Sequence, residues 1–191
     1  MRILLAGANG VLGRAVLPYL TRHKVVGLTR SPEKLDSLRK LGAKPVVCDV
    51  YDYDMLLRVA LRARPRIVVN FLTDLAAGSA AANDRIRREG GANVLEAAKA
   101  TAASRLVVGS VAFTLDGDSG KAVEQLEQAT LGFAGESVIL RFGRLWGPGT
   151  YYRTSPRPPA VHIETAGARA ARLLVHERPG TYLVTDTNGS G

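Results

Sequence analysis

The sequence predicts an α/β protein: a doubly wound, Rossmann-like parallel sheet with helices on both faces. Short apolar runs alternate with helical patterns up to Arg141, which is typical of βαβ units. Runs such as Ile67-Val68-Val69 are apolar throughout, as expected for strands that are buried on both faces. Because 191 residues can bury one full core, we expect a single domain over residues 1–191.

The apolar periodicity predicts the order of the elements. Strands are expected at residues 2–6, 24–29, 44–48, 66–71, 105–109, 137–141 and 181–185. Helices are expected at residues 10–22, 31–41, 52–63, 83–102, 121–131 and 164–176. Pro18 should kink the first helix or start its last turn, and Ser31 can cap the second, with Pro32 in its first turn. Residues 155–159 (SPRPP) predict a stiff connection without a helix, and residues 187–191 a frayed tail.

The composition argues against several classes of protein. The net charge is +9, but the arginines are scattered and no aromatic residues lie between them, so solvated helix faces explain them better than a nucleic-acid surface. No apolar run is long enough to span a bilayer, and the apolar start breaks into glycines, so we expect no membrane association and a cytoplasmic location. Cys48 is the single cysteine, and His23, His162 and His176 show no metal-ligand spacing.

A glycine-rich loop follows the first predicted strand and opens the first predicted helix. Gly7 permits a tight turn, Gly10 lets the backbone approach a diphosphate, and Gly13 lets the helix pack on the sheet. Free N–H groups at the start of the helix then face the anion. The loop therefore predicts a dinucleotide site. Its predicted contact residues are Gly7, Asn9, Gly10, Val11, Leu12 and Gly13.

The spacing of this loop, G-x-x-G-x-x-G, resembles that of the extended and atypical short-chain dehydrogenases/reductases, the NAD(P)-dependent epimerase/dehydratase group. Further segments resemble motifs of this family: residues 46–50 (VVCDV), 69–73 (VNFLT), 91–98 (GANVLEAA), 140–149 (LRFGRLWGPG) and 161–166 (VHIETA). The resemblance covers nearly the whole chain. It implies that Asp49 and Val50 lie by the adenine, and that Phe71, Leu72 and Thr73 lie over the middle of the cofactor. It also implies a small-molecule substrate, and dimerisation through the long helices is common in the family.

The end of the second predicted strand bears on the choice between NAD and NADP. A carboxylate there would accept hydrogen bonds from both ribose hydroxyls and favour NAD. This chain has Arg30 and Ser31 instead, and Arg30 can pair with a 2′-phosphate. We therefore expect NADP, with NAD as the alternative. A capping role for Ser31 is the competing interpretation.

The catalytic motif departs from the family pattern. The family uses Y-x-x-x-K together with a hydroxyl residue near the end of the fifth strand, so that a Tyr whose pKa the Lys lowers can move a proton. Lys121 matches the family Lys, but the Tyr position falls on Gly117, and the hydroxyl position falls on Ser110 or Val111. Lys121 is thus expected to hold the ribose hydroxyls of the cofactor, and Lys121 and Ser110 are the candidate catalytic residues.

The C-terminal part is shorter than the family pattern. The family inserts a substrate domain between its G-P-G turn and its V-H-V-D-D element, where this chain has only residues 150–160. Residues 150–191 are therefore expected to form a reduced substrate-side region. The favoured hypothesis is an NADPH-dependent oxidoreductase on a small substrate. The first alternative is a non-catalytic NAD(P)-binding sensor or regulatory module. A nucleic-acid-associated protein is the third and least favoured hypothesis.

Overall fold

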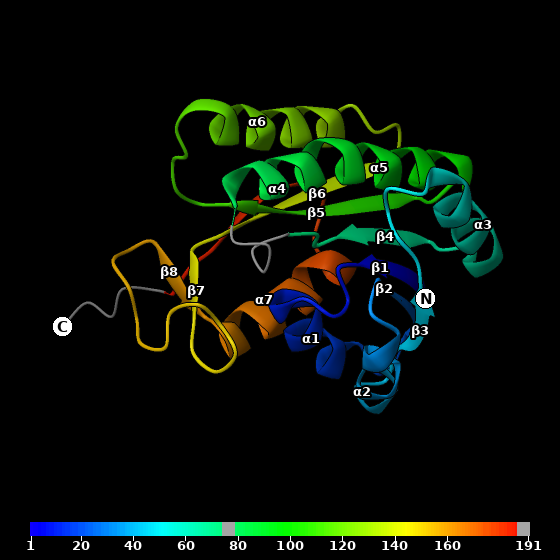
Figure 1. The fold of residues 1–191 in the computed structure, drawn as a ribbon, viewed down its shortest axis with the longest axis horizontal. Coiled ribbons are helices and arrows are strands. Elements are labelled where there is room, and N and C mark those ends of the chain that lie inside the picture. Colours follow the sequence, from blue (N-terminus) through cyan, green and yellow to red (C-terminus); the bar gives the residue numbers. More distant parts are fainter. Residues whose placement is uncertain (74–78, 187–191) are drawn as a thin grey trace.

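The computed structural model describes residues 1–73 and 79–186. Within them, seven parallel strands form one sheet in the order β3-β2-β1-β4-β5-β6-β9 (Figure 1). The strands are β1 (Arg2–Ala6), β2 (Lys24–Thr29), β3 (Lys44–Val47), β4 (Ile67–Asn70), β5 (Arg105–Val111), β6 (Glu136–Phe142) and β9 (Gly180–Val184). The order reverses between β1 and β4, and ligands of doubly wound sheets bind at such a switch point. The predicted fold class is confirmed.

Helices cover both faces of the sheet, as Figure 1 shows. The face with the first and last helices carries α1 (Val11–Val16), the 3₁₀ helix η1 (Leu17–Leu20), the 3₁₀ turn η2 (Pro32–Lys34), α2 (Leu35–Lys40) and α7 (Ile163–His176). The opposite face carries α3 (Tyr53–Ala63), α4 (Ala80–Arg85), the π-helix η4 (Ile86–Gly90), α5 (Gly91–Ala100) and α6 (Gly117–Leu131). No helix of the described residues is both long and apolar enough to cross a membrane.

The core has two parts, one on each face of the sheet. On β5 the side chains alternate, so Val107 is buried towards α1 and α7, whereas Leu106 and Val108 are buried towards α3 and α5. Each of these three valine and leucine side chains is almost fully buried. Burial on both faces explains why the strands are continuous apolar runs in the sequence.

Three of the differences between the predicted and observed helix boundaries have a clear local description. The first helix becomes 3₁₀ after Val16, with Pro18 in the first turn of η1, where its missing N–H costs no helical bond. The long helix begins earlier than residue 83, because the Ser79 hydroxyl accepts the N–H of Ala82 at 3.1 Å and starts α4 there. The last difference is that α6 begins at Gly117 rather than at residue 121.

The predicted cap at Ser31 is wrong. Its side chain makes no capping bond to η2; instead its own N–H donates to the hydroxyl of Thr29 at 3.1 Å. Pro32 does occupy the first turn of η2, as predicted. The side chain of Ser31 is therefore not engaged in capping, which was the competing explanation for this residue.

A small second sheet follows β6. Strand β7 (Arg144–Trp146) pairs in parallel with β8 (Ala160–His162), and residues 155–159 between them contain no helix, as predicted. The indole N–H of Trp146 donates to the carboxylate of Asp186 at 2.8 Å, and the backbone N–H of His162 donates to the same carboxylate. Asp186 thereby fastens the end of the described chain to this sheet. The tail predicted at residues 187–191 lies outside the described residues.

Candidate cofactor site and its neighbouring pocket

The glycine loop connects β1 to α1 at the carboxyl end of the sheet. Gly7 has φ +82°, and a Cβ on it would lie 2.5 Å from the carbonyl oxygen of Phe71. A Cβ on Gly13 would lie 2.2 Å from the carbonyl oxygen of Gly7. Both clashes are with backbone, which cannot turn aside as a side chain can. Gly7 and Gly13 therefore let the loop fold against β4 and against itself.

Gly10 plays a different part in this loop. Its N–H donates to the carbonyl of Gly7 at 3.0 Å, and a Cβ on it would meet that carbonyl oxygen at 3.2 Å, with no other described atom beyond its two chain neighbours within 4 Å. The outer side of the loop is thus open, and Val11 beside it is 40% exposed. The first N–H groups of α1 have no carbonyl partner within the helix and favour an anion there. These features fit a diphosphate that lies against the loop.

The ends of β2 and β3 lie on the same side of the sheet. Arg30 directly follows β2 and is exposed. After β3, the carboxylate of Asp49 accepts the N–H of Tyr51 at 3.0 Å, and the carbonyl of buried Val50 accepts the side-chain amide of Asn93 at 2.8 Å. The amide of Asn93 therefore fixes the turn predicted to lie by the adenine. Asn93 is part of the GANVLEAA motif, but the motif alone did not predict that its side chain would bind the carbonyl of Val50.

The turn after β4 is the fourth predicted contact segment at the carboxyl edge of the sheet. Asn70 is buried, and its side-chain oxygen accepts the N–H of Leu72 at 3.1 Å. Phe71 donates its N–H to the carbonyl of Ala6 at 3.0 Å and packs edge-on against Phe142, with 6.0 Å between ring centroids. Thr73 is exposed and is the last described residue before the gap. The predicted contact residues of the four βα turns thus lie along one edge of the sheet.

Ser110 belongs to a buried polar cluster under α6. Its hydroxyl donates to the carboxylate of Glu127 at 2.5 Å, and Arg141 donates two hydrogen bonds to the same carboxylate, at 2.9 and 2.5 Å. Burial alone would raise the pKa of Glu127, but the bonds from Arg141 and Ser110 outweigh it and lower that pKa. The hydrogen bond to Glu127 and the charge of its carboxylate conversely leave Arg141 with a raised pKa. The sequence offered no signal for this pairing, because the three residues lie on different elements.

Lys121 lies apart from this cluster. Its side chain is 70% exposed and its ammonium is 3.8 Å from the carboxylate of Asp118, one turn earlier in α6. Gly117, at the position of the family Tyr, lies at the start of α6 with φ +60°, and beyond its chain neighbours and the backbone of its own helix no described atom lies within 4 Å of the place of its Cβ. The structure therefore does not bring Lys121 and Ser110 into a common hydrogen-bonded group.

A pocket of about 360 Å³ lies between α6, the turn after β5 and the edge formed by β6 and β9. Its lining combines apolar side chains with polar ones, including the ion pair of Glu127 and Arg141. The lining residues are Val111, Ala112, Phe113, Thr114, Leu115, Gly120, Val123, Glu124, Glu127, Arg141 and Leu183. Lys121 is not among them. The pocket begins where β5 ends, which is the same edge of the sheet as the glycine loop.

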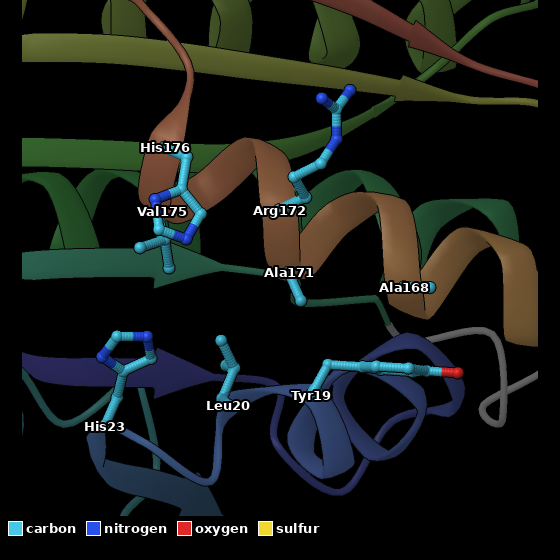
Figure 2. A pocket seen from close by; sticks show the side chains of 8 residues that line it. All are labelled: Tyr19, Leu20, His23, Ala168, Ala171, Arg172, Val175 and His176. Carbon is cyan, nitrogen blue, oxygen red and sulfur yellow. The ribbon is translucent and has the colours of Figure 1, made fainter.

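A second pocket, of about 240 Å³, lies between η1 and α7 (Figure 2). Tyr19 and His23 border it on one side, and Arg172 and His176 on the other. Two histidines that are far apart in sequence thus share one pocket, although the described residues contain no group of three side chains that could hold a metal ion. Because His23 immediately precedes β2, this pocket lies at the opposite end of the strands from the glycine loop.

Comparison with known proteins agrees with this geometry. Residues 7–134 match a family model described as NAD(P)H-binding. The 3-diazoavenalumate denitrifying reductase of a Streptomyces species is 33% identical over 235 residues, which span 97% of this chain and 76% of that protein. Since this alignment is longer than the chain, the reductase contains segments that have no counterpart here.

Solved structures show the same fold. The UDP-glucose 4-epimerase of Thermus thermophilus, in complex with NAD, is 16% identical with a TM-score of 0.78, and the match covers 97% of this chain and 78% of that one. WbmG of Bordetella bronchiseptica, also in complex with NAD, is 20% identical with a TM-score of 0.76, and the match covers 97% and 72%. The fold is thus that of the epimerase/dehydratase-like enzymes indicated by the motifs, and the chain belongs to the NAD(P)H-binding family.

Proposed function

We propose that this protein is an NADPH-dependent reductase of a small substrate. The main support for cofactor binding is the open glycine loop together with the adjoining βα turns. The similarity to a Streptomyces reductase supports reduction as the class of reaction. Bound NADPH supplies a hydride, which with a proton from solvent reduces an acceptor by two electrons. The chain itself positions the cofactor. The loop at Gly10 holds the diphosphate, the turn at Asp49 and Val50 the adenine side, and the residues after β4 the middle of the cofactor.

Arg30 is proposed to select NADPH over NADH, because it follows β2 where the adenosine ribose is expected and can pair with the 2′-phosphate. Arg30→Asp should lower NADPH affinity at least tenfold more than NADH affinity, since the new carboxylate repels the phosphate and accepts bonds from the ribose hydroxyls. Fluorescence titration with each nucleotide measures this. Arg22→Asp makes the same charge change at another exposed site and should leave the ratio unchanged. Equal losses for both nucleotides in Arg30→Asp would refute the assignment.

Lys121 and Ser110 remain the proposed catalytic pair, and substitutions separate their roles. Lys121 is exposed enough to reach ribose hydroxyls, so Lys121→Met should raise the KM for NADPH about tenfold, the loss expected for a hydrogen bond to a charged group. Ser110→Ala tests whether the hydroxyl leaves Glu127 during the reaction. A fall in kcat with an unchanged KM would indicate a role in the chemistry. Unchanged kcat with lower stability would restrict Ser110 to supporting Glu127.

The assay for the function follows NADPH oxidation with a panel of quinones, flavins, small carbonyl compounds and an aryl diazo compound. Turnover with at least one class is expected. Binding of NADPH without turnover on any acceptor would favour the alternative, a non-catalytic sensor or regulatory module. That alternative rests on Gly117, which leaves the family Tyr position without a side chain.

A further inference from the structure

Phe113 lines the pocket between α6 and β9, and Arg144 packs against the Phe113 ring. Phe113 lies in the turn after β5, and Arg144 is the first residue of β7, which follows β6. The guanidinium carbon of Arg144 lies 4.3 Å from the centroid of the Phe113 ring. Because β5 and β6 are neighbours in the sheet, both residues leave it at the carboxyl edge, where the glycine loop also lies. Arg144, a half-buried residue, is thus held beside the pocket that Phe113 lines.

The positive charge of Arg144 is not neutralised within the described chain. Its side chain contacts the Phe113 ring and donates to the carbonyl of Pro158 at 3.4 Å, and none of the ion pairs found among the described residues includes it. Arg141 differs, since it makes two hydrogen bonds to the carboxylate of Glu127. A second carboxylate beside Arg141 would be repelled by Glu127. An anionic group entering this region is therefore attracted to Arg144 and not to Arg141.

The pocket has room for a small organic molecule. Its volume of about 360 Å³ is near the lower end of the range of small-molecule sites, and its lining combines apolar side chains such as Leu115 with the charged groups of Glu124, Glu127 and Arg141. Glu124 and Glu127 line it from α6, so an acid would place its carboxylate away from α6. Phe113 both lines this pocket and contacts the guanidinium of Arg144.

We propose that Arg144, held against Phe113, binds the carboxylate of the substrate, and that the substrate is a small organic acid whose body occupies this pocket. The inference rests on the proposed function, because it assigns the pocket to the substrate of the reductase. An Arg beside a carboxylate can make two parallel hydrogen bonds, which also orient the bound acid.

The test measures binding of cinnamate and of methyl cinnamate to the NADP⁺-bound protein by calorimetry. The wild-type chain should bind the acid at least tenfold more tightly than the ester. Arg144→Met keeps an apolar stem on Phe113 without the charge, so it should lose at least tenfold in affinity for the acid and little for the ester. Arg144→Lys should retain part of the preference. Arg153→Met, at an exposed arginine of the nearby connection, should change neither affinity. NADPH affinity should be the same in all four proteins.

Each outcome bears on one of the two proposals. Equal binding of acid and ester by the wild-type protein overturns the role of Arg144, whether or not any variant folds. Loss of acid binding in Arg153→Met as large as in Arg144→Met overturns it as well. Acid preference without turnover on any acceptor leaves the binding role in place and contradicts the reductase. Turnover of neutral acceptors without a preference for the acid supports the reductase and contradicts the binding role of Arg144.

Discussion

Gly10→Ala should lower NADPH affinity at least tenfold while leaving the free energy of unfolding nearly unchanged. The added Cβ meets only the Gly7 carbonyl oxygen, at 3.2 Å, so the loop has to yield by a few tenths of an ångström. On its open side, however, the methyl occupies the space through which the diphosphate approaches the backbone. Fluorescence titration with NADPH and urea denaturation, done on the same preparation, separate the two effects.

Two other glycines serve as controls for this prediction. Gly132→Ala adds a Cβ at ordinary contact distance, 3.5 Å from the Ala129 carbonyl oxygen at the end of α6, and should change neither quantity. Gly13→Ala places a Cβ 2.2 Å from the Gly7 carbonyl oxygen and should lose both affinity and stability, by about 1–3 kcal/mol for the latter. If Gly10→Ala bound NADPH as tightly as Gly132→Ala, the diphosphate would not lie against this loop.

Arg141→Met should destabilise the protein by about 3 kcal/mol at pH 7, because it leaves the carboxylate of Glu127 buried with Ser110 alone. This loss of stability is at the lower end of the range for breaking a buried ion pair, because the Arg141 side chain is 44% exposed. The double variant Arg141→Met/Glu127→Leu removes the stranded charge and should recover most of the loss. Urea denaturation of the wild type and both variants measures this. A double variant no more stable than the single one would contradict the explanation.

The same cluster sets a dependence on pH. In the wild type the pKa of Glu127 is lowered, so its stabilising contribution is present above the ordinary pKa of about 4.5 and is lost as the pH falls through the lower value of the folded state. Without Arg141, burial dominates and raises that pKa. The variant then gains relative stability as Glu127 takes up a proton, and the difference between wild type and Arg141→Met should shrink between pH 7 and pH 4. A constant difference over this range would show that Glu127 is not the titrating group.

The sequence was informative wherever a local pattern has one physical cause. Continuous apolar runs placed the strands because a doubly covered parallel sheet buries both faces of each strand. Helix ends were less well predicted. The hydrogen bond from the N–H of Ala82 to the Ser79 hydroxyl starts α4 earlier than predicted. Likewise, α1 gives way to the 3₁₀ helix η1 at Pro18. Both boundaries depend on local hydrogen bonds, about which apolar periodicity carries no information. The competing prediction that Ser31 caps its helix failed because its side chain makes no bond to η2, while its N–H donates to Thr29.

By itself the sequence determined the α/β class and the glycine loop, since a strand, three glycines at fixed spacing and a helix start are adjacent in the chain. Only the tertiary structure brought Ser110, Glu127 and Arg141 into one hydrogen-bonded cluster and placed Arg144 against Phe113. The residues that meet come from strands, from the turn after β5 and from α6, and they lie 14 or more residues apart in the chain. Their contacts depend on how the sheet packs. The physical reason is that local patterns fix backbone conformation, whereas side chains from distant segments meet only when the sheet and helices bury their apolar faces together.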